Sequence, residues 1–532
     1  MYNNYTPLQQ RQLALQEYSN TQSTYLLVCA PARSTALKST LTDQLHRKFR
    51  LVDRLDGELT ASVDGVLLAA EDVELMSTAL MYFAKALQDG ADYVACNAVF
   101  GFGGATALYQ SQPLQAQNRC AVVSRTLLER CRAAAHDPEN VPELLALAAQ
   151  LCTRPTLIPQ ALLHYERGIC AEDAFSAHGK RAFIMSHVLD MTGAPIVLVS
   201  AVPVLRSMGY EVLVLGPSDG GSLHLFLDAG ASVITRSSCR NVSDAWGMAL
   251  CADFVIVNTV VMARAVRALS GTAVPVLWWL HDAFAGYPHI AHQIPRELGE
   301  NIRLYSVGSH AANAMHSVRP EFNIRPLIYG LPDYAAEKFS HYDLSYAGGR
   351  PLFATVGSFE NRKGQDIFCK AIRLLPPETM KKASFLFVGK AAEAEMMDAV
   401  RSLTADCPDN VFYVKRLTRD EIKSLMAQCT CLVCASRDDP MPTFVTEGLI
   451  FGKPAIVSEH TGTAGLITEG VDGFVYEDDD PEKLAERLAW AIEHPEKLAA
   501  MRPACRELYE SHYSKQAFSD SLQQAVKELT GE

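Results

Sequence analysis

The sequence lacks any concentration of positive charge. Its 60 aspartate and glutamate residues outnumber its 48 lysine and arginine residues, and the net charge is −12. A surface of this kind repels phosphate unless basic groups are gathered locally, and no basic tract interrupts the chain. We therefore expect no nucleic acid among the partners of this protein.

Long apolar runs are also missing. The apolar run at residues 25–30 is too short to span a membrane or to form the core of a good signal sequence, so we expect a buried strand there. Peripheral contact with the inner face of a membrane stays open, because an acceptor on a lipid carrier would need only a small basic or apolar patch.

Paired metal-binding cysteines are absent as well. The 14 cysteines are scattered, and the C-x-x-C of Cys431 and Cys434 has no second pair at zinc-ribbon spacing. Many cysteines lie within apolar strands, which is typical of reduced, buried thiols in a cytoplasmic protein. The sequence therefore predicts a cytoplasmic location.

The chain does contain enough apolar sequence for a globular α/β protein. Its 532 residues, 48% hydrophobic and 20% charged, suffice for about three domains that each bury a core. A polar stretch at residues 168–180 separates two folded patterns, and beyond it strands alternate with helical stretches. A second strand series starts at Phe353, and Asp480 with Pro481 marks the start of a late helix. This alternation predicts parallel sheets.

Asp439 and Glu447 are separated by seven residues, between an apolar strand and a turn at residues 448–454. Two prolines mark a helix start, with Thr443 as its expected cap, and free N–H groups at such an end suit a phosphate. The donors would come from the backbone around Pro442, Thr443, Phe444 and Val445. The two carboxylates would address different hydroxyls of one extended ligand. The alternative is a capping acid followed by a surface helix acid.

Arg362 and Lys363 form a second candidate site. They follow a strand that ends at Gly357, and they precede Gly364 and an amphipathic helix. An arginine fork and a lysine point charge together can neutralise a diphosphate at the carboxyl edge of a parallel sheet. Alone, such a pair would be a solvated surface feature.

Taken together, these motifs resemble the retaining glycosyltransferases of family 4, which have the two-domain GT-B architecture. The match continues upstream through the glycine loop at Gly193, the segment at residues 279–282 and the crossing at residues 329–333. It covers residues 180–525. The resemblance implies two Rossmann-like domains that face a cleft, an acceptor domain at residues 180–335 and a donor domain at residues 336–510. A helix at residues 511–532 would cross back to the first.

The resemblance also implies the roles of the donor-side residues. Glu447 is similar to the family residue that accepts hydrogen bonds from the ribose, and Asp439 to the one that orients the transferred sugar. Arg362 and Lys363 would stabilise the leaving diphosphate, so the nucleotide diphosphosugar would need neither metal nor other cofactor. The chain departs from the family in having Asp439 where glutamate is usual and Ser358 where many members have arginine.

On the acceptor side, His281 would contact the sugar or the approaching acceptor, and Asp282 would orient His281 or assist proton transfer. Gly193 would let the backbone approach the diphosphate closely. A histidine and aspartate at a strand end also form a common structural cap. The acceptor would be a glycan, a lipid-linked glycan or a protein.

Residues 1–168 resemble a degenerate GT-A glycosyltransferase of family 2. Where that family has a D-x-D metal site, this chain reads Ala69-Ala70-Glu71-Asp72, so the leading carboxylate is missing. Glu71 and Asp72 could still bind magnesium, although adjacent acids at a helix start are more often caps. We interpret this segment as an inactive accessory domain that docks an assembly partner, forms a homo-oligomer or shapes the acceptor entrance.

Three functions from different classes remain open at this stage. The first is an active retaining glycosyltransferase in the synthesis of a bacterial surface polysaccharide or glycoconjugate. The second is a pseudoenzyme that scaffolds a glycan assembly complex. The third is a GT-B sugar-nucleotide epimerase or phosphorylase, which would consume its donor without acceptor or would require inorganic phosphate.

The resemblance predicts that transfer proceeds without a divalent metal, because cations and amides stabilise the leaving group. Sugar transfer measured with and without a chelator is expected to be the same. Complete loss of sugar transfer in chelator, with recovery when manganese is added, would contradict this prediction. It would favour a metal site at Glu71 and Asp72 instead.

Overall fold

The computed structural model describes residues 23–30, 34–55, 62–70, 73–102, 106–110, 120–165, 179–218, 220–236, 239, 246–477 and 479–531. The predicted acids Glu71 and Asp72, and most of the predicted boundary at residues 168–180, lie outside these ranges. Contacts along the chain divide it into two compact units, Met1–Val255 and Ile256–Glu532. The predicted domain ranges contain no break at this point, and they stay predictions.

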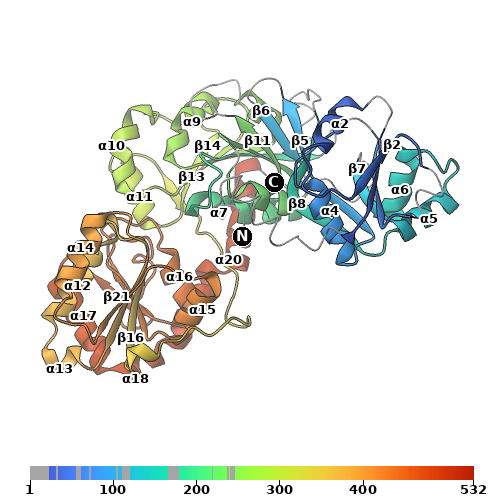
Figure 1. Cartoon of the computed structure of the whole chain (residues 1–532). Helices are drawn as coiled ribbons and strands as arrows, with labels where there is room; N and C mark the ends of the chain where they lie inside the picture. The colour runs from blue at the N-terminus through green and yellow to red at the C-terminus, as the bar shows by residue number, and fades with distance from the viewer. Residues whose placement is uncertain are drawn as a thin grey trace. The chain divides into compact units, whose positions relative to one another are not determined.

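The first unit contains a mixed sheet with the strand order β9-β10-β11-β6-β5-β7-β3-β1-β2 (Figure 1). Strand β8 pairs with β5 and β4. The strands are β1 (Leu26–Cys29), β2 (Phe49–Val52), β3 (Gly65–Ala69), β4 (Glu74–Leu75), β5 (Tyr93–Phe102), β6 (Thr106–Gln110), β7 (Cys120–Ser124), β8 (Pro155–Tyr165), β9 (Lys180–Met185), β10 (Tyr210–Gly216) and β11 (Ser232–Arg236). The apolar run at residues 25–30 thus contains the buried strand β1, as the sequence predicts.

Strands from both sides of the predicted boundary at residues 168–180 belong to this one sheet. β6 pairs with β11 in antiparallel register, with Tyr109 opposite Val233 and Thr106 opposite Arg236. β11 in turn pairs in parallel with β10, and β10 with β9. The backbone hydrogen bonds of the ladder therefore continue from the first predicted domain into the second.

Helices cover the sheet of the first unit, and their apolar faces account for its core. Leu127, Cys131 and Leu144 pack with the buried strand residues Val66 and Tyr93 in one cluster. The helices are α2 (Thr35–Leu41), α4 (Ala79–Gln88), α5 (Arg125–Ala134), α6 (Val141–Leu151), α7 (Gly193–Ser207) and α8 (Leu223–Asp228). A 3-10 turn, η4, spans Gly247–Cys251.

In the second unit the first group of neighbouring strands has the order β15-β14-β13-β12. β13 and β14 pair in parallel, as do β14 and β15. The elements are β12 (Phe254–Asn258, which begins at the unit boundary), η5 (Val260–Met262), α9 (Ala263–Leu269), β13 (Val276–Leu280), η6 (Phe284–Gly286), α10 (Tyr287–Ile290), η7 (Ala291–Gln293), β14 (Ile302–Ser306), α11 (Ser309–His316) and β15 (Ile324–Pro326).

The other sheet of the second unit has six parallel strands in the order β18-β17-β16-β19-β20-β21. Its central strands are fully or nearly fully buried, as expected when helices cover both faces. The strands are β16 (Leu352–Val356), β17 (Ser384–Val388), β18 (Val411–Val414), β19 (Cys431–Cys434), β20 (Ala455–Ser458) and β21 (Gly473–Tyr476). The predicted parallel α/β fold is therefore confirmed.

Figure 1 shows α12, α14 and α17 on one face of this sheet and α15 and α16 on the other. The predicted cap Asp480 accepts a hydrogen bond from the N–H of Glu482 at the start of α17. The remaining elements are η8 (Ser345–Ala347), η9 (Asn361–Lys363), α12 (Gln365–Leu374), α13 (Pro377–Met380), α14 (Ala394–Leu403), α15 (Arg419–Gln428), α16 (Thr443–Ile450), α17 (Pro481–Glu493), α18 (Pro495–Ala500), α19 (Arg502–Leu508), η10 (Tyr509–Tyr513) and α20 (Lys515–Thr530).

The last helix, α20, returns to strand β13. The ring of Phe518 stacks on the ring of Trp279 with 5.8 Å between their centroids, and the Trp279 indole N–H donates to the carbonyl of Leu327. The backbone N–H of Leu331 donates to the carbonyl of Tyr513 just before the helix. These contacts fix the C-terminal helix against the β13–β15 group.

The cysteines that the structure describes are free thiols, and all but Cys152 and Cys251 are buried. Within the described part of the chain, no helix has both the length and the apolar character needed to cross a membrane.

The backbone at Gly364, in the loop after β16, lies very close to the backbone at Ala435, which follows β19. A substitution at Gly364 tests this close approach. Its φ is +64°, and a Cβ built there would lie 1.8 Å from the carbonyl oxygen of Ala435. We expect Gly364→Ala to lower the free energy of unfolding by about 3 kcal/mol or more, because backbone strain and a backbone clash add. Gly349→Ala is the matched control, since its φ is +68° but a Cβ there meets nothing within 4 Å. Urea unfolding that shows equal losses for both variants would contradict the clash.

Candidate active site

The centre of the candidate site is an ion pair between two loops that leave neighbouring strands. Nζ of Lys363 lies 2.6 Å from Oδ2 of Asp439, with the two side chains 19% and 6% exposed. Lys363 ends η9 after β16, and Asp439 follows β19. Because β16 and β19 pair in parallel, both loops leave the same edge of the sheet. The structure thus brings together a cation and an acid that the sequence placed in separate candidate sites.

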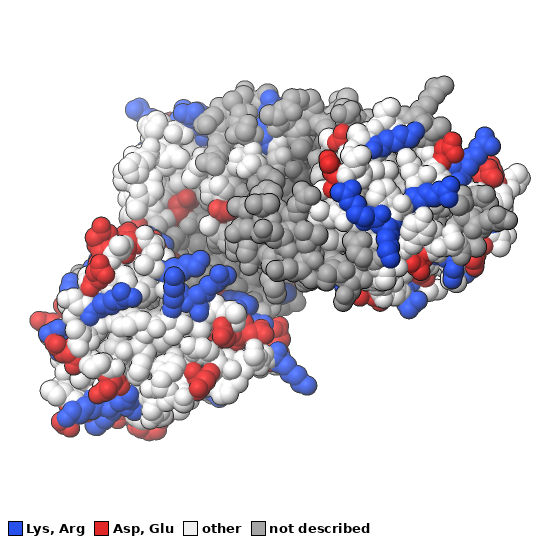
Figure 2. All heavy atoms as spheres, in the orientation of Figure 1, with Lys and Arg blue, Asp and Glu red and all other residues white. Residues whose placement is uncertain are grey.

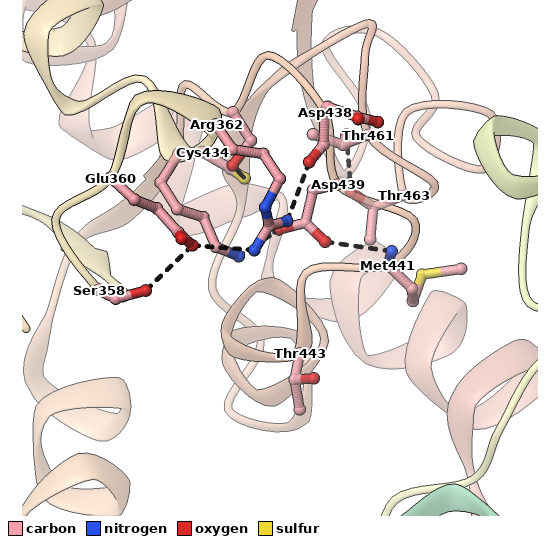
Figure 3. A network of polar contacts seen from close by, with 12 residues as sticks. Ser358, Glu360, Arg362, Cys434, Asp438, Asp439, Met441, Thr443, Thr461 and Thr463 are labelled. Carbon is pink, nitrogen blue, oxygen red and sulfur yellow. Dashed lines mark hydrogen bonds and ion pairs between the residues drawn. The ribbon is translucent and has the colours of Figure 1, made fainter. Parts of the chain in front are cut away.

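Arg362 joins the same network (Figure 3). Its guanidinium donates to the carbonyl oxygen of Asp438 and to Oε1 of Glu360, each at 2.9 Å. The hydroxyl of Ser358 donates to the same Glu360 oxygen at 3.0 Å. The two predicted cations are therefore fixed next to one another before any ligand binds.

The backbone around Asp439 is held on its other side by the loop after β20. The N–H of Asp439 donates to the carbonyl of His460, and its carbonyl accepts from the N–H of Gly462. A Cβ at Gly462 would lie 1.7 Å from the carbonyl oxygen of Pro440, so only glycine permits this approach. The Asp439 carboxylate also accepts a long hydrogen bond from the N–H of Met441 at 3.3 Å. These bonds leave the Asp439 side chain little freedom to move.

Asp438 is a residue that the sequence reasoning missed. Its carboxylate accepts from Nε2 of His310 at 2.7 Å and from the N–H groups of Phe284 and Ala285 at 3.1 and 3.0 Å. Burial raises the pKa of Asp438, but the bond from His310 and the two amide bonds outweigh it and lower the pKa overall. The loop after β13 is thereby tied to the loop after β19. The partners lie more than 120 residues away in sequence, so no local pattern could have identified them.

Glu447 lies on α16 and is buried, with its side chain 8% exposed. Its Oε1 accepts a hydrogen bond from Nη1 of Arg419 at 2.5 Å. Burial raises the pKa of Glu447, and the charge and hydrogen bond of Arg419 oppose this rise. The sequence placed Glu447 in the site but gave no sign of Arg419.

The start of α16 differs from its prediction. Pro442, not Thr443, is the capping residue, and no side chain caps the helix. Thr443 instead accepts a hydrogen bond from the hydroxyl of Tyr329 at 3.3 Å. The N–H of Val445 donates to the carbonyl of Pro442, which removes Val445 from the expected free donors. Thr443 and Phe444 begin the helix, with Thr443 exposed and Phe444 buried.

His281 and Asp282 follow β13. The His281 ring packs on the Trp279 ring with 4.7 Å between centroids. Oδ2 of Asp282 accepts from the backbone N–H of Val260 at 2.6 Å, and burial raises the Asp282 pKa to about 6. A carboxyl group with this pKa can hold or release a proton near neutral pH.

Gly193 belongs to the first unit, where it is the first residue of α7 after Thr192. A Cβ at this position would meet nothing within 4 Å, so packing within its surroundings does not require glycine. Its predicted role at the diphosphate stays a prediction. Among the residues whose placement is described, no group of three histidine, cysteine, aspartate or glutamate side chains is arranged to hold a metal ion.

Two family profiles match the chain. The profile described as glycosyl-transferase family 4 matches residues 178–314, and the profile described as glycosyl transferases group 1 matches residues 338–508. Together they include the ion pair of Lys363 and Asp439, the helix with Glu447, and the segment with His281 and Asp282.

Curated relatives match parts of the chain. An uncharacterized glycosyltransferase of Methanocaldococcus jannaschii is 26% identical over 144 residues, which are 26% of this chain and 38% of that protein. A glycogen synthase of Pseudomonas syringae pv. syringae is 26% identical over 201 residues, 37% of this chain and 39% of that protein. The chain spans less than half the length of these relatives.

Solved structures share the fold over about two thirds of the chain. HepE of Anabaena in complex with UDP is 17% identical with a TM-score of 0.53, and the match covers 66% of this chain and 100% of HepE. Sucrose-phosphate synthase of Thermosynechococcus elongatus is 14% identical with a TM-score of 0.52, covering 66% of this chain and 99% of that one. These likenesses are to GT-B folds, so the predicted GT-B architecture is confirmed.

The raised pKa of Asp282 gives a pH-dependent prediction. Between about pH 4 and 6 the folded state holds a proton that the unfolded chain has lost, so stability falls as pH rises through this window. We expect Asp282→Asn to remove this slope, which reaches at most about 1.4 kcal/mol per pH unit. Urea unfolding of both proteins from about pH 4.5 to 7 measures it. Asp398→Asn, at an exposed position on α14, is the control, and identical slopes in native protein and Asp282→Asn would contradict the assignment.

Proposed function

The profile matches at residues 178–314 and 338–508 make the chain a member of the family 4 and group 1 glycosyltransferases, and we propose that it is a retaining enzyme. In this proposal it moves a sugar from a nucleotide diphosphosugar to a hydroxyl acceptor in the cytoplasm. The product is part of a bacterial surface polysaccharide or glycoconjugate. The single observation that carries the proposal is the pair of Lys363 and Asp439 at the carboxyl edge of a parallel sheet, with Arg362 beside it.

The cations account for departure of the nucleotide diphosphate. An ammonium group has three donors, and the bond to Asp439 uses one, which leaves two for phosphate oxygens. Arg362 uses two of its five donors on Glu360 and the Asp438 carbonyl, so part of its fork also remains. Negative charge grows on the diphosphate as the glycosidic bond breaks, and groups fixed in advance stabilise that charge without reorganising. We therefore propose that transfer needs no metal.

Asp439, the acid of the ion pair, would act on the sugar portion of the nucleotide diphosphosugar. Lys363 and the Met441 N–H hold the Asp439 carboxylate at the mouth of the loop, where it would orient the hydroxyls of the transferred sugar. A carboxylate there also stabilises the positive charge that develops at the sugar ring during transfer. The aspartate is one methylene shorter than the glutamate usual in the family, so the backbone bonds that hold its loop matter more for its position.

His281 and Asp282 would serve the acceptor. The Asp282 pKa of about 6 suits a group that assists transfer of the acceptor's proton, while His281 would contact the sugar or the acceptor hydroxyl. The backbone amides of Phe284 and Ala285 donate to the carboxylate of Asp438. These bonds connect the segment that contains His281 and Asp282 to the loop after β19. Attack from the face that the diphosphate leaves would retain the anomeric configuration.

Structural relatives support the class of donor. HepE of Anabaena has been solved with UDP, with UDP and glucose, and with UDP-glucose. A nucleotide diphosphosugar is the ligand that the cations, the start of α16 and Glu447 would accommodate together. We propose that residues 1–168 are an accessory segment for a homo-oligomer or an assembly partner.

Lys363 and Glu447 test this proposal. We expect Lys363→Ala and Glu447→Ala each to lower the turnover number by orders of magnitude while the protein stays folded, because each removes charge or hydrogen bonding at the donor. Release of nucleoside diphosphate in the presence of donor and acceptor measures turnover, and circular dichroism checks the fold.

Lys381→Ala is the matched control, because Lys381 pairs with Glu378 on an exposed surface and its loss should leave turnover unchanged. Near-normal turnover in both site variants would rule out the assignment. Consumption of donor without acceptor would indicate an epimerase, and a requirement for inorganic phosphate would indicate a phosphorylase.

A further inference from the structure

Arg419 reaches from the surface to a buried acid. It is the first residue of α15, its side chain is 50% exposed, and it donates to Glu447, whose side chain is only 8% exposed. The pair therefore joins an accessible guanidinium to a carboxylate that has little access to water. Neither the motif around Glu447 nor its spacing from Asp439 predicts this partner.

The position of Arg419 is fixed by its neighbours. Thr418 caps α15 by accepting from the N–H of Glu421, while the Glu421 carboxylate accepts from the N–H of Thr418. The Arg419 guanidinium lies over the ring of Tyr334, 4.9 Å from the ring centroid. Nζ of Lys423 also lies over this ring, 4.6 Å from the centroid. Cation–π contacts of this kind restrict the guanidinium plane. Arg419 is thus held in one orientation toward Glu447.

The ionisation state of Glu447 depends on the burial of its carboxyl group and on the charged groups around it. Burial raises its pKa, and Arg419 is the largest influence that lowers it, followed by the charge of Lys423. Other titratable or charged groups lie on the segments packed around α16. They are Asp420 and Glu421 on α15, Cys431 and Cys434 on β19, Arg502, Cys505, Arg506 and Glu507 on α19, Tyr509, Glu510, His512 and Tyr513 on η10, and Tyr329. Arg506 is engaged with Asp333, Glu510 and the Ile450 carbonyl, so it does not replace Arg419. A buried carboxylate that loses its only direct cation takes up a proton more readily.

We infer that Arg419 is a positioning residue of the donor site, which holds Glu447 ionised and oriented to accept hydrogen bonds from the ribose hydroxyls. This inference rests on the proposed function. The Arg419 bond uses Oε1 of Glu447, and in the described part of the chain no hydrogen bond uses Oε2, which is left for the ligand. A protonated Glu447 would have lost acceptor capacity, and one without Arg419 would also have lost its fixed orientation.

Nucleotide binding provides the test. UDP, ADP and GDP, each with its 2′,3′-dideoxy analogue, are titrated into the native protein and into Arg419→Ala, and dissociation constants are measured between about pH 6 and 8. In the native protein we expect the ribonucleotide to bind about tenfold or more tightly than its dideoxy analogue, since the lost bonds end on a charged group. In Arg419→Ala we expect this ratio to fall toward one, and to fall further as pH is lowered. The ribonucleotide and its dideoxy analogue have the same phosphate groups. The effect of phosphate titration on the two dissociation constants therefore cancels in their ratio.

Three further variants make the result specific. Arg419→Lys keeps a cation and should restore much of the ratio and its pH profile. Tyr334→Leu loosens Arg419 without unpairing Glu447, so it should reduce the ratio less than Arg419→Ala does and keeps the test available if that variant fails to fold. Arg373→Ala is the matched control, because Arg373 is 45% exposed and pairs with an exposed carboxylate, Asp406.

The outcomes separate the inference from the proposed function. Equal loss of affinity for the ribonucleotide and its dideoxy analogue in Arg419→Ala would leave their ratio unchanged and would overturn the inference, because it would mean that Arg419 contacts the phosphates or the base. Unchanged affinity for both nucleotides would overturn it as well. Absence of binding by every nucleotide to the native protein would instead overturn the donor site itself, and the inference with it.

Discussion

The ion pair between Lys363 and Asp439 is the interaction on which the rest of the site depends. It exists because β16 and β19 are parallel neighbours, so the loop with the cations and the loop with the acid leave one edge of the sheet together. Breaking such a pair would leave a partly buried charge without its partner, which is costly. The N–H of Arg437 adds a backbone bond to the carbonyl of Arg362 across the same gap. The strand ladder therefore positions the two loops. The positions of Lys363 and Asp439 follow from the positions of their loops.

The parts of this arrangement that follow local rules could be predicted from the sequence. The alternation of strands with helical stretches predicted parallel sheets, and the glycine after an apolar strand with the adjacent cations predicted a loop at the end of a strand. The Asp480 cap was also found as expected. The GT-B fold followed from the combination of motifs and not from any single one. The roles assigned to the individual residues of the site stay predictions.

Other features could not be predicted because they join segments far apart in sequence. Asp438 looks like a duplicate of Asp439, and only the folded chain shows that it binds His310 and two amides after β13. Arg419 looks like an ordinary first-turn residue of a helix until Glu447 is found beside it. Thr443 has the right chemistry for a cap, but the rigid φ of Pro442 placed the start of the helix one residue earlier. For Asp438 and Arg419, tertiary contacts decided between locally plausible choices.

Basic side chains of the second unit are not restricted to the loops of the candidate site. Figure 2 shows lysine and arginine side chains gathered between the places where α14 and α16 are drawn in Figure 1, on a chain whose net charge is −12. Aspartate and glutamate side chains lie next to these basic groups in the same view, so charges of both signs share this surface.

In the first unit, β11 has β10 on one side and β6 on the other, so its ladder is complete only when the amino-terminal segment is present. Separated from that segment, β11 would offer a row of unsatisfied backbone groups that favours aggregation. The pairing of β6 with β11 therefore covers backbone groups that would otherwise form an exposed sheet edge, so residues 106–110 help to complete the sheet that contains β9, β10 and β11.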